Sequence, residues 1–401
     1  MTPNLRARLT LELARGLGLT TTTKLIEALG SAESVVEAPA ARYETVEGVG
    51  RTRASKARRA IDEAIRDGAV DRELERVDAA GVSLLCPEDA AYPRLLRYIP
   101  DPPNVLWVRG DMVAGDALAA AIVGSRRCSL YGREQADRFG GQIAEAGLTV
   151  VSGGAYGIDK AAHDAAIAVR GRTIAVIGSG LGKPYPPPHR PLFDRIAGEG
   201  WGAVVSEFPM QSPVSRQNFH RRNRLISGLS LGTLVVEAGR HSGALITARQ
   251  CVEDHGRDLT VLPGRVDSPA SVGCHRILRE GWGQLVTKPA QVIETADQAA
   301  RVLLQDVELL ATETAKTHEA AADGDANDRQ TAAAEPSGTL FDGVQATLLD
   351  ALSSPRSVDE LAAVSGLDVS QVQSELTMLQ VRGQVAARGG LYHRLSRPPG
   401  A

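Results

Sequence analysis

The sequence predicts an α/β protein whose central part is a parallel sheet with helices on both faces. From Ala117 onward, short runs of Ala, Val, Ile and Leu alternate with longer helical patterns. Such continuously apolar strands are typical of parallel sheets that are buried on both faces. Glycine-rich turns follow the strands, and ligands of these sheets bind beyond the carboxyl ends of the strands. The turns therefore mark the first place to look for a site.

The composition of the chain limits the number of domains and the classes of protein that fit. The chain has 401 residues, of which 43% are hydrophobic and only 4% aromatic, so we expect a core of Ala, Val, Leu and Ile and two to three domains. None of the four cysteines lies in CxxC spacing, and we expect no metal site, disulfide framework or cofactor. The first residues lack the apolar segment of a signal peptide, and no apolar run is long enough to cross a bilayer. We expect a cytoplasmic protein without membrane contact.

Residues 1–80 are helical in pattern and form the first expected domain. Between two helices, an apolar-x-Gly-apolar-Gly turn contains Gly48 and Gly50 and leads into a basic segment, 51–59. This turn resembles the helix-hairpin-helix hairpin, in which backbone N–H groups meet a DNA phosphate. A SAM- or helix-hairpin-helix-like domain is therefore expected. The alternative is a hairpin that only packs and carries a solvated basic face.

Residues 81–305 contain the predicted sheet. The strands are expected at Ala119–Val123, Leu148–Val151, Thr173–Ile177, Ala203–Ser206, Thr233–Val236 and, as the last one, Leu259–Leu262. Helices are expected around Tyr131–Ala146, from Asp159 to Val169 and over Gly243–His255. At the strand ends, Gly124-Ser125-Arg126 and the turn from Ser152 to Asp159 offer backbone N–H groups at helix N-termini, which favours an anion.

A basic cluster interrupts this pattern between Arg216 and Arg224. Four arginines, one histidine and one phenylalanine fall within nine positions, although the whole chain has a net charge of -3. Guanidinium groups pair with phosphate oxygens, and a phenyl ring can stack on a base. The cluster predicts a polyphosphate or nucleic-acid ligand. We expect a short helix, Leu225–Leu229, to project Arg224 beside Gly124 and Gly153.

A structural interpretation of the same cluster stays open. Asn223 and Arg224 could cap the following helix or pair with Glu237 and Asp159, and Phe219 could belong to the core. We favour structural roles for both carboxylates over catalytic ones.

The remainder of the chain divides into a linker and a tail. Residues 306–340 hold eight acidic and two basic residues and few apolar ones, which predicts an acidic flexible linker. Residues 341–401 show helical patterns at 343–352, 357–365 and 369–382 before a β-like end, the order of a winged helix. The third pattern has almost no Lys or Arg to hold phosphates, so a partner or regulatory role is favoured over duplex reading.

Several motifs in register resemble the DNA-processing protein A (DprA/Smf) family, over roughly 87–294. They are Gly124-Ser125-Arg126, Ser152-Gly153-Gly154-Ala155-Tyr156-Gly157-Ile158-Asp159, Phe219-His220-Arg221-Arg222-Asn223-Arg224, Ser242-Gly243-Ala244-Leu245-Ile246-Thr247-Ala248 and Leu262-Pro263-Gly264. The resemblance implies an extended Rossmann-like core that binds single-stranded DNA. It also implies a homodimer, and loading of the RecA recombinase onto DNA during natural transformation (competence).

The resemblance carries a DNA pocket over to matched positions. These are Gly124, Ser125, Arg126, Ser152, Gly153, Phe219, Arg221, Arg222, Asn223 and Arg224, with Lys183 as a further candidate. The sequence departs from the family at Gly182, where Asp is usual, and at His275, where Asn is common.

The competing class is an enzyme. Gly178-Ser179-Gly180-Leu181-Gly182-Lys183 is no Walker A loop, because the spacing is wrong and Pro184 stands at the Ser/Thr position, and no G-x-S-x-G elbow occurs. Related Rossmann-like hydrolases of the LOG type use a P-G-G-x-G-T-x-x-E turn. Here Gly232-Thr233 and Glu237 remain, but the Pro-Gly-Gly is missing and one extra residue precedes the glutamate. We therefore expect a recombination mediator and not an enzyme, with the LOG-type hydrolase as the alternative.

Overall fold

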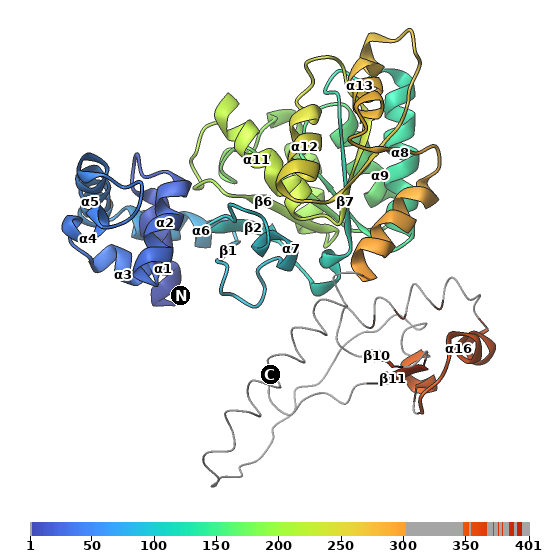
Figure 1. Ribbon diagram of the computed structural model, residues 1–401, viewed down its shortest axis with the longest axis horizontal. Coiled ribbons are helices and arrows are strands. Elements are labelled where there is room, and N and C mark those ends of the chain that lie inside the picture. The colour runs from blue at the N-terminus through green and yellow to red at the C-terminus, as the bar shows by residue number, and fades with distance from the viewer. Residues whose placement is uncertain are drawn as a thin grey trace. The chain divides into compact units, whose positions relative to one another are not determined.

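The computed structural model (Figure 1) describes residues 2–301, 348–352, 354–366, 372, 376, 379, 385–388 and 391–394. The chain divides into two compact units, Met1–Ala296 and Asp297–Ala401. The expected linker, 306–340, lies outside the described residues. The expected boundary near residue 80 falls within the first unit and stays a prediction.

The first unit begins with a helical region that has its own apolar core. Its helices are α1 (Pro3–Leu13), α2 (Leu19–Leu29), α3 (Ala32–Glu37), α4 (Ala40–Glu44), α5 (Arg51–Arg66) and α6 (Ala69–Ala79). Leu11, Leu25, Tyr43 and Ile61 are fully buried together in this core. The helical prediction for this region is confirmed.

The expected glycine turn lies between α4 and α5. Gly48 has φ +79°, a conformation that residues with a side chain rarely adopt. Arg58 does not face outward but donates to the carbonyl oxygens of Val36 (2.6 Å) and Ala38 (3.0 Å), so it fixes the hairpin. Arg51 and Arg53 are exposed. DNA contact at this hairpin stays a prediction.

A nine-stranded sheet forms the centre of the unit, in the order β1-β2-β6-β5-β4-β3-β7-β8-β9. The strands are β1 (Val82–Leu85), β2 (Leu106–Gly110), β3 (Ala119–Gly124), β4 (Thr149–Ser152), β5 (Thr173–Val176), β6 (Gly202–Ser206), β7 (Gly232–Glu237), β8 (Asp258–Val261) and β9 (Gln284–Leu285). All neighbours from β6 to β9 pair in parallel, which confirms the predicted parallel core. The prediction that β8 is the last strand is wrong, because β9 pairs alongside it. The antiparallel pairs β1–β2 and β2–β6 were also not predicted.

Helices cover both faces of the sheet, as Figure 1 shows for α8 and α9 against α11 and α12. The bounds of these and the remaining helices are α7 (Arg94–Arg97), α8 (Leu130–Glu145), α9 (Ile158–Ala168), α10 (Arg190–Gly198), α11 (Arg216–Gly228), α12 (Ala244–Arg249) with a π-helical turn at Gln250–Asp254, and α13 (Val272–Glu280). Successive strand residues alternate between faces: Ile122 packs with Phe139 of α8, whereas Val123 packs with Leu225 and Ile226 of α11. The two-sided packing prediction is confirmed.

The helical region and the sheet share one apolar cluster. Leu9 of α1 and Val70 and Val77 of α6 pack with Trp107 of β2 and Phe193 of α10. The N-terminal helices are therefore part of the support of the sheet and not only an appendage to it.

The described part of the second unit contains α16 (Val358–Ser365) and an antiparallel hairpin of β10 (Val385–Arg388) and β11 (Leu391–Arg394). Ser357 caps α16 through a reciprocal capping box with Glu360. Leu348, Leu361, Val372, Leu376, Leu379 and Val385 are buried together. The second helical prediction, 357–365, is confirmed within one residue. The predictions at 343–352 and 369–382 fall partly outside the described residues.

Candidate nucleic-acid interface

A cleft of about 1170 Å³ opens at the carboxyl ends of the central strands. It is formed by the loops after β3, β4 and β7 and by one face of α11. Its lining includes Gly124, Ser125, Arg126, Arg127, Asp159, Arg216, Phe219, His220, Arg222, Asn223, Arg240, His241, Ser242 and Thr247. The cleft lies where the glycine turns predicted a site, beyond the carboxyl ends of the strands, and its use as a binding site stays a prediction.

The lining is strongly basic. Five arginines and two histidines face one carboxylate, Asp159. Among the residues that the structure describes, the guanidinium groups of Arg126, Arg127, Arg216 and Arg240 form no ion pair with a carboxylate. A polyanion that enters the cleft can therefore pair with these groups without breaking an internal salt bridge.

The turn after β3 presents its arginine but not the helix N-terminus that we expected. Helix α8 begins later, at Leu130, and its N-cap Ser129 donates both its N–H (2.7 Å) and its hydroxyl (2.6 Å) to the carboxylate of Glu237. The N–H of Ser125 is also engaged, by the carbonyl oxygen of Glu237 at 2.7 Å. Gly124, Ser125 and Arg126 line the cleft, but helix α8 does not begin at this turn, and an anion site here stays a prediction.

The turn after β4 is packed too closely for its serine to reach the cleft. Ser152 is fully buried and donates to the carbonyl oxygen of Ile122 at 2.6 Å. A Cβ at Gly153 would collide with Arg222 Nη1 and lie 2.6 Å from Asp159 Oδ2, so any side chain here would displace these two groups. Ser152 is therefore a correction to the expected set, whereas Gly153 lies beside the arginine that lines the cleft.

Arg222 and Asp159 form the buried floor of the cleft. The Arg222 guanidinium donates to the carbonyl oxygen of Val176, and burial lowers its pKa from 12.5 to about 10, so it stays charged at neutral pH. Burial raises the pKa of Asp159, against the opposing effect of the Arg222 charge. Asp159 is close enough to Arg222 for the two charges to interact, whereas Arg224 is held by Glu207 and Asp101. The expectation that Asp159 holds an arginine in position stays a prediction.

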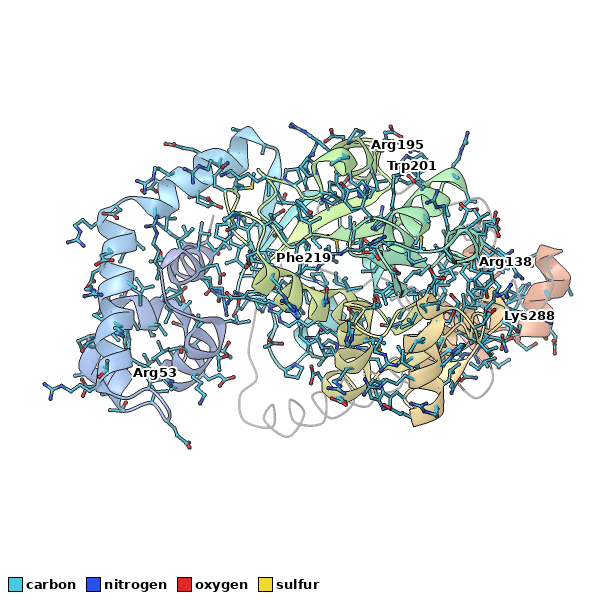
Figure 2. The ribbon with its side chains drawn as sticks, turned by 90° about the horizontal axis from the view of Figure 1, so that it is seen from above. Arg53, Arg138, Arg195, Trp201, Phe219 and Lys288 are labelled. Atoms are coloured by element: carbon cyan, nitrogen blue, oxygen red, sulfur yellow. The ribbon has the colours of Figure 1, made fainter. Side chains whose placement is uncertain are left out.

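Phe219 lies between two guanidinium groups. The Cζ of Arg126 lies 4.5 Å and that of Arg222 5.7 Å from the ring centroid, and Tyr185 meets the ring at its edge. Phe219 also lines a small aromatic slot with Gly153, Tyr156 and Tyr185. It is half-buried at the surface of α11, as Figure 2 shows, and not in the apolar core. A base can stack on this ring only after Arg126 has moved off it.

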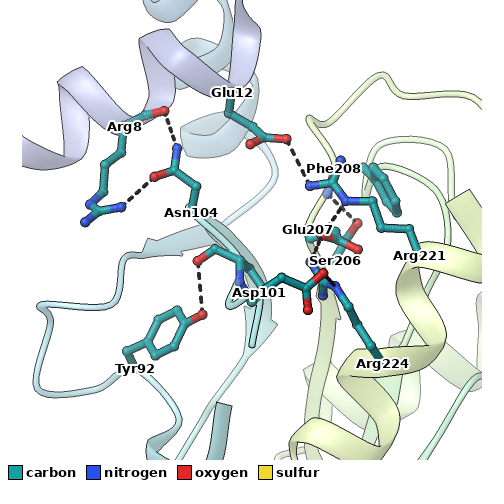
Figure 3. A network of polar contacts seen from close by, with 11 residues as sticks. Arg8, Glu12, Tyr92, Asp101, Asn104, Ser206, Glu207, Phe208, Arg221 and Arg224 are labelled. Carbon is teal, nitrogen blue, oxygen red and sulfur yellow. Dashed lines mark hydrogen bonds and ion pairs between the residues drawn. The ribbon is translucent and has the colours of Figure 1, made fainter. Parts of the chain in front are cut away.

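Arg221 and Arg224 do not line the cleft, although we expected both to do so. Arg224 is only 3% exposed, and it donates to Glu207 at 2.6 Å and to Asp101 at 2.9 Å (Figure 3). Arg221 lies 2.9 Å from the same Glu207 carboxylate and packs over Phe208. The physical reason is helical phase, because the basic cluster lies entirely within α11 and not before a short helix at Leu225–Leu229. Arg224 consequently lies at the end of β6 instead of beside Gly124 and Gly153.

Other residues of the interface were missed or displaced. Lys183 is exposed and lies outside the cleft lining. Arg240 and His241 line the cleft but were not predicted, although the strand-end rule could have found them because they closely follow β7. Arg216 and His220 belonged to the basic cluster and were not chosen as site residues. Arg53 of the basic hairpin lies well apart from Phe219 (Figure 2).

Other classes of site find no support in the described part of the chain. No group of three or more His, Cys, Asp or Glu side chains there could hold a metal ion. No helix among these residues is long and apolar enough to cross a membrane.

The chain is similar to known proteins along most of its length. Residues 83–297 match the family model of DNA recombination-mediator protein A, and residues 328–390 match the DprA winged helix domain. Protein Smf of Escherichia coli (strain K12) is 37% identical over 314 residues, 78% of each chain. The putative DNA processing protein DprA of Mycobacterium tuberculosis (strain H37Rv) is 34% identical over 354 residues, 84% of this chain and 82% of that protein.

A solved structure supports the same assignment. The X-ray structure of DNA processing protein A from Streptococcus pneumoniae aligns with a TM-score of 0.62 and 32% identity, over 73% of this chain and 98% of that one. The family expected from the motifs, the Rossmann-like core and the C-terminal winged helix are confirmed.

Proposed function

Because the chain belongs to the DNA recombination-mediator protein A family, we propose that its basic cleft binds single-stranded DNA. One observation carries the proposal: Arg126, Arg127, Arg216 and Arg240 converge on one cleft without a carboxylate partner among the described residues. A nucleic-acid strand carries several phosphates, each of which can pair with one of these guanidinium groups.

The recessed aromatic ring favours a single strand over a duplex. Phe219 lies within the cleft beside the slot of Tyr156 and Tyr185, so only a base that has left its stack reaches these rings. Arg126 would exchange its contact with the Phe219 face for a phosphate oxygen as the base enters. Asn223, which lines the same wall, supplies an amide for base or sugar oxygens.

The finer role follows from the family resemblance. The protein loads RecA onto single-stranded DNA during natural transformation, acts as a homodimer and works in the cytoplasm. These statements extend the family membership and need tests of their own: RecA pulldown, sedimentation and cell fractionation. The winged helix serves a partner or regulatory role, in line with the near absence of basic residues from 369–382.

A binding role also agrees with the surroundings of Glu237, the glutamate that corresponds to the one in the LOG-type turn. Glu237 is 2% exposed and accepts hydrogen bonds from both the N–H and the hydroxyl of Ser129, so it holds α8 in place. A carboxylate engaged in this way is poorly available as a general base. We therefore favour a mediator over a hydrolase.

The test compares single- and double-stranded oligonucleotides of one sequence, about 20 nucleotides long, by fluorescence anisotropy. We expect full-length protein and residues 1–305 to bind the single strand much more tightly than the duplex. Arg216→Ala should weaken binding about tenfold, whereas Arg138→Ala, which removes the same charge on α8 well away from Phe219 (Figure 2), should not. Equal affinity for both forms of DNA, or equal effects of both variants, would refute the proposal.

A further inference from the structure

Helix α11 has two faces with different tasks. Arg216, Phe219, His220, Asn223 and Ile226 line the cleft. Their spacing of three and four residues places them on one side of the helix. Arg221 and Arg224 share the opposite side and point away from the cleft, toward the N-terminal helices (Figure 3).

The rear face of α11 is held by a buried carboxylate. Glu207, which follows β6 directly, is 1% exposed, and its Oε2 lies 2.9 Å from Arg221 Nε and 2.6 Å from Arg224 Nη2. Asp101, from the loop before β2, adds a second contact to Arg224 at 2.9 Å. Arg224 is therefore enclosed by protein groups, whereas Arg221 is partly exposed but has its guanidinium engaged by Glu207.

The N-terminal helices contact the same assembly at two points. Glu12 of α1 lies 3.7 Å from Arg221 Nη2 and extends the chain of charges from Glu207. Glu73 of α6 is 1% exposed and accepts hydrogen bonds from Trp107 Nε1 (3.2 Å) and from the N–H of Met210 (2.5 Å). Met210 lies in the segment that leads from β6 into α11, so this segment and the rear face of α11 are both tied to the N-terminal helices.

We infer that this network is a positioning device: Glu12 and Glu73 hold α11 through Arg221 and Met210, so that the cleft face of the helix keeps its DNA-binding geometry. The inference rests on the proposed function. It assigns the N-terminal helical region a part in DNA binding without any contact to DNA. It also makes Arg221 and Arg224 positioning residues instead of ligands.

Salt dependence separates positioning residues from phosphate ligands. A lost phosphate contact reduces the slope of log affinity against log salt concentration by about 0.7 for a single strand. A lost positioning contact lowers affinity at every salt concentration and leaves the slope unchanged, because the same phosphates are neutralised.

The experiment measures anisotropy of a fluorescein-labelled oligothymidylate at several salt concentrations, with the full chain. Glu12→Lys is the informative variant because the two explanations predict opposite results. If only overall charge matters, the added positive charge strengthens DNA binding. If Glu12 positions α11, the new lysine repels Arg221, releases α11 and weakens DNA binding. We expect affinity to fall about three- to tenfold with an unchanged slope. Arg126→Ala should lower both the affinity and the slope. Glu63→Lys, which makes the same charge change at the exposed Arg59–Glu63 pair of α5, is the matched control and should not weaken binding.

Hydrogen exchange gives a second readout that needs no DNA. Amides of α11 should exchange faster in Glu12→Lys than in the wild type, whereas those of α8 should not change. If Glu12→Lys does not fold, Glu12→Gln replaces it, with the same direction and a smaller change. Unchanged or tighter binding of a folded Glu12 variant, or unchanged α11 exchange, overturns the positioning role. If the wild-type protein does not bind DNA, the proposed function is refuted. In that case the hydrogen-exchange result alone decides whether Glu12 positions α11.

Discussion

The pair Arg224 and Arg216 on one helix gives the sharpest test of which arginines fold the protein and which bind. Arg224→Ala removes a side chain that is 3% exposed and leaves Glu207, 1% exposed, with only one of its two guanidinium partners. Removing one partner of a buried ion pair costs about 3 kcal/mol. For a unit that spans Met1–Ala296, that loss corresponds to a melting temperature lower by about 5 °C.

Arg216→Ala should show the opposite behaviour. The side chain is exposed at the mouth of the cleft and has no carboxylate partner among the described residues, so its loss should leave the melting temperature unchanged. Loss of a charge-assisted phosphate contact of about 1.5 kcal/mol should weaken oligonucleotide binding about tenfold. Both variants are measured by circular dichroism melting and by anisotropy on the same samples. An Arg224→Ala protein with an unchanged melting temperature and a lowered salt slope would refute the reasoning.

Three further predictions concern Glu12, Gly153 and the hydrolysis of nucleotides. Burial raises the pKa of Glu12 from 4.5 to about 7. The charge of Arg221 opposes this shift, and the charge of Glu207 adds to it. Between these two pH values, the folded protein therefore binds one more proton than the unfolded protein. The free energy of unfolding should therefore fall by about 3 kcal/mol as the pH rises from 4.5 to 7. In Glu12→Gln, the urea midpoint should depend less on pH. An equal dependence of the urea midpoint on pH in both proteins would contradict this. Gly153→Ala forces a Cβ against Arg222 and Asp159 and should cost about 1–3 kcal/mol in urea unfolding, so an unchanged midpoint would show that the turn can relax. The protein should not hydrolyse ATP or nucleoside monophosphates. Hydrolysis by RecA-free protein that is lost in Glu237→Gln would favour the LOG-type hydrolase.

The sequence was sufficient to predict the parallel sheet and a cleft at its strand ends. Apolar strand patterns and the glycine turns after them are local signals, so β3 to β8 and the cleft beyond their ends were predicted correctly. The short edge strands were not predicted, because β1, β2 and β9 gain their identity from pairing with distant segments. The family motifs identified the residues of the basic cluster but not the direction in which each one points.

The errors in the site come from helical phase and from distant partners. Once α11 includes Arg216, a period of 3.6 residues separates Phe219 and Asn223 from Arg221 and Arg224, and this separation could have been predicted from a longer helix. The partners of Arg221 could not, because Glu12 comes from α1, far away in the chain, and Glu207 lies beyond the loop between β6 and α11. Ser152 was misplaced for a related reason: its hydroxyl meets the carbonyl of Ile122 on the neighbouring strand, which no local pattern reveals.

We propose that unpaired guanidinium groups of the cleft neutralise the phosphates of a single strand, and the salt dependence of binding is the decisive measurement. With about four phosphates neutralised, the slope of log affinity against log salt concentration should be about -3 for the wild type. The triple variant Arg126→Ala, Arg216→Ala, Arg240→Ala removes three of these contacts and should bring the slope to about -1. A flat response of the wild type, or a triple variant that keeps the wild-type slope, would contradict the claim.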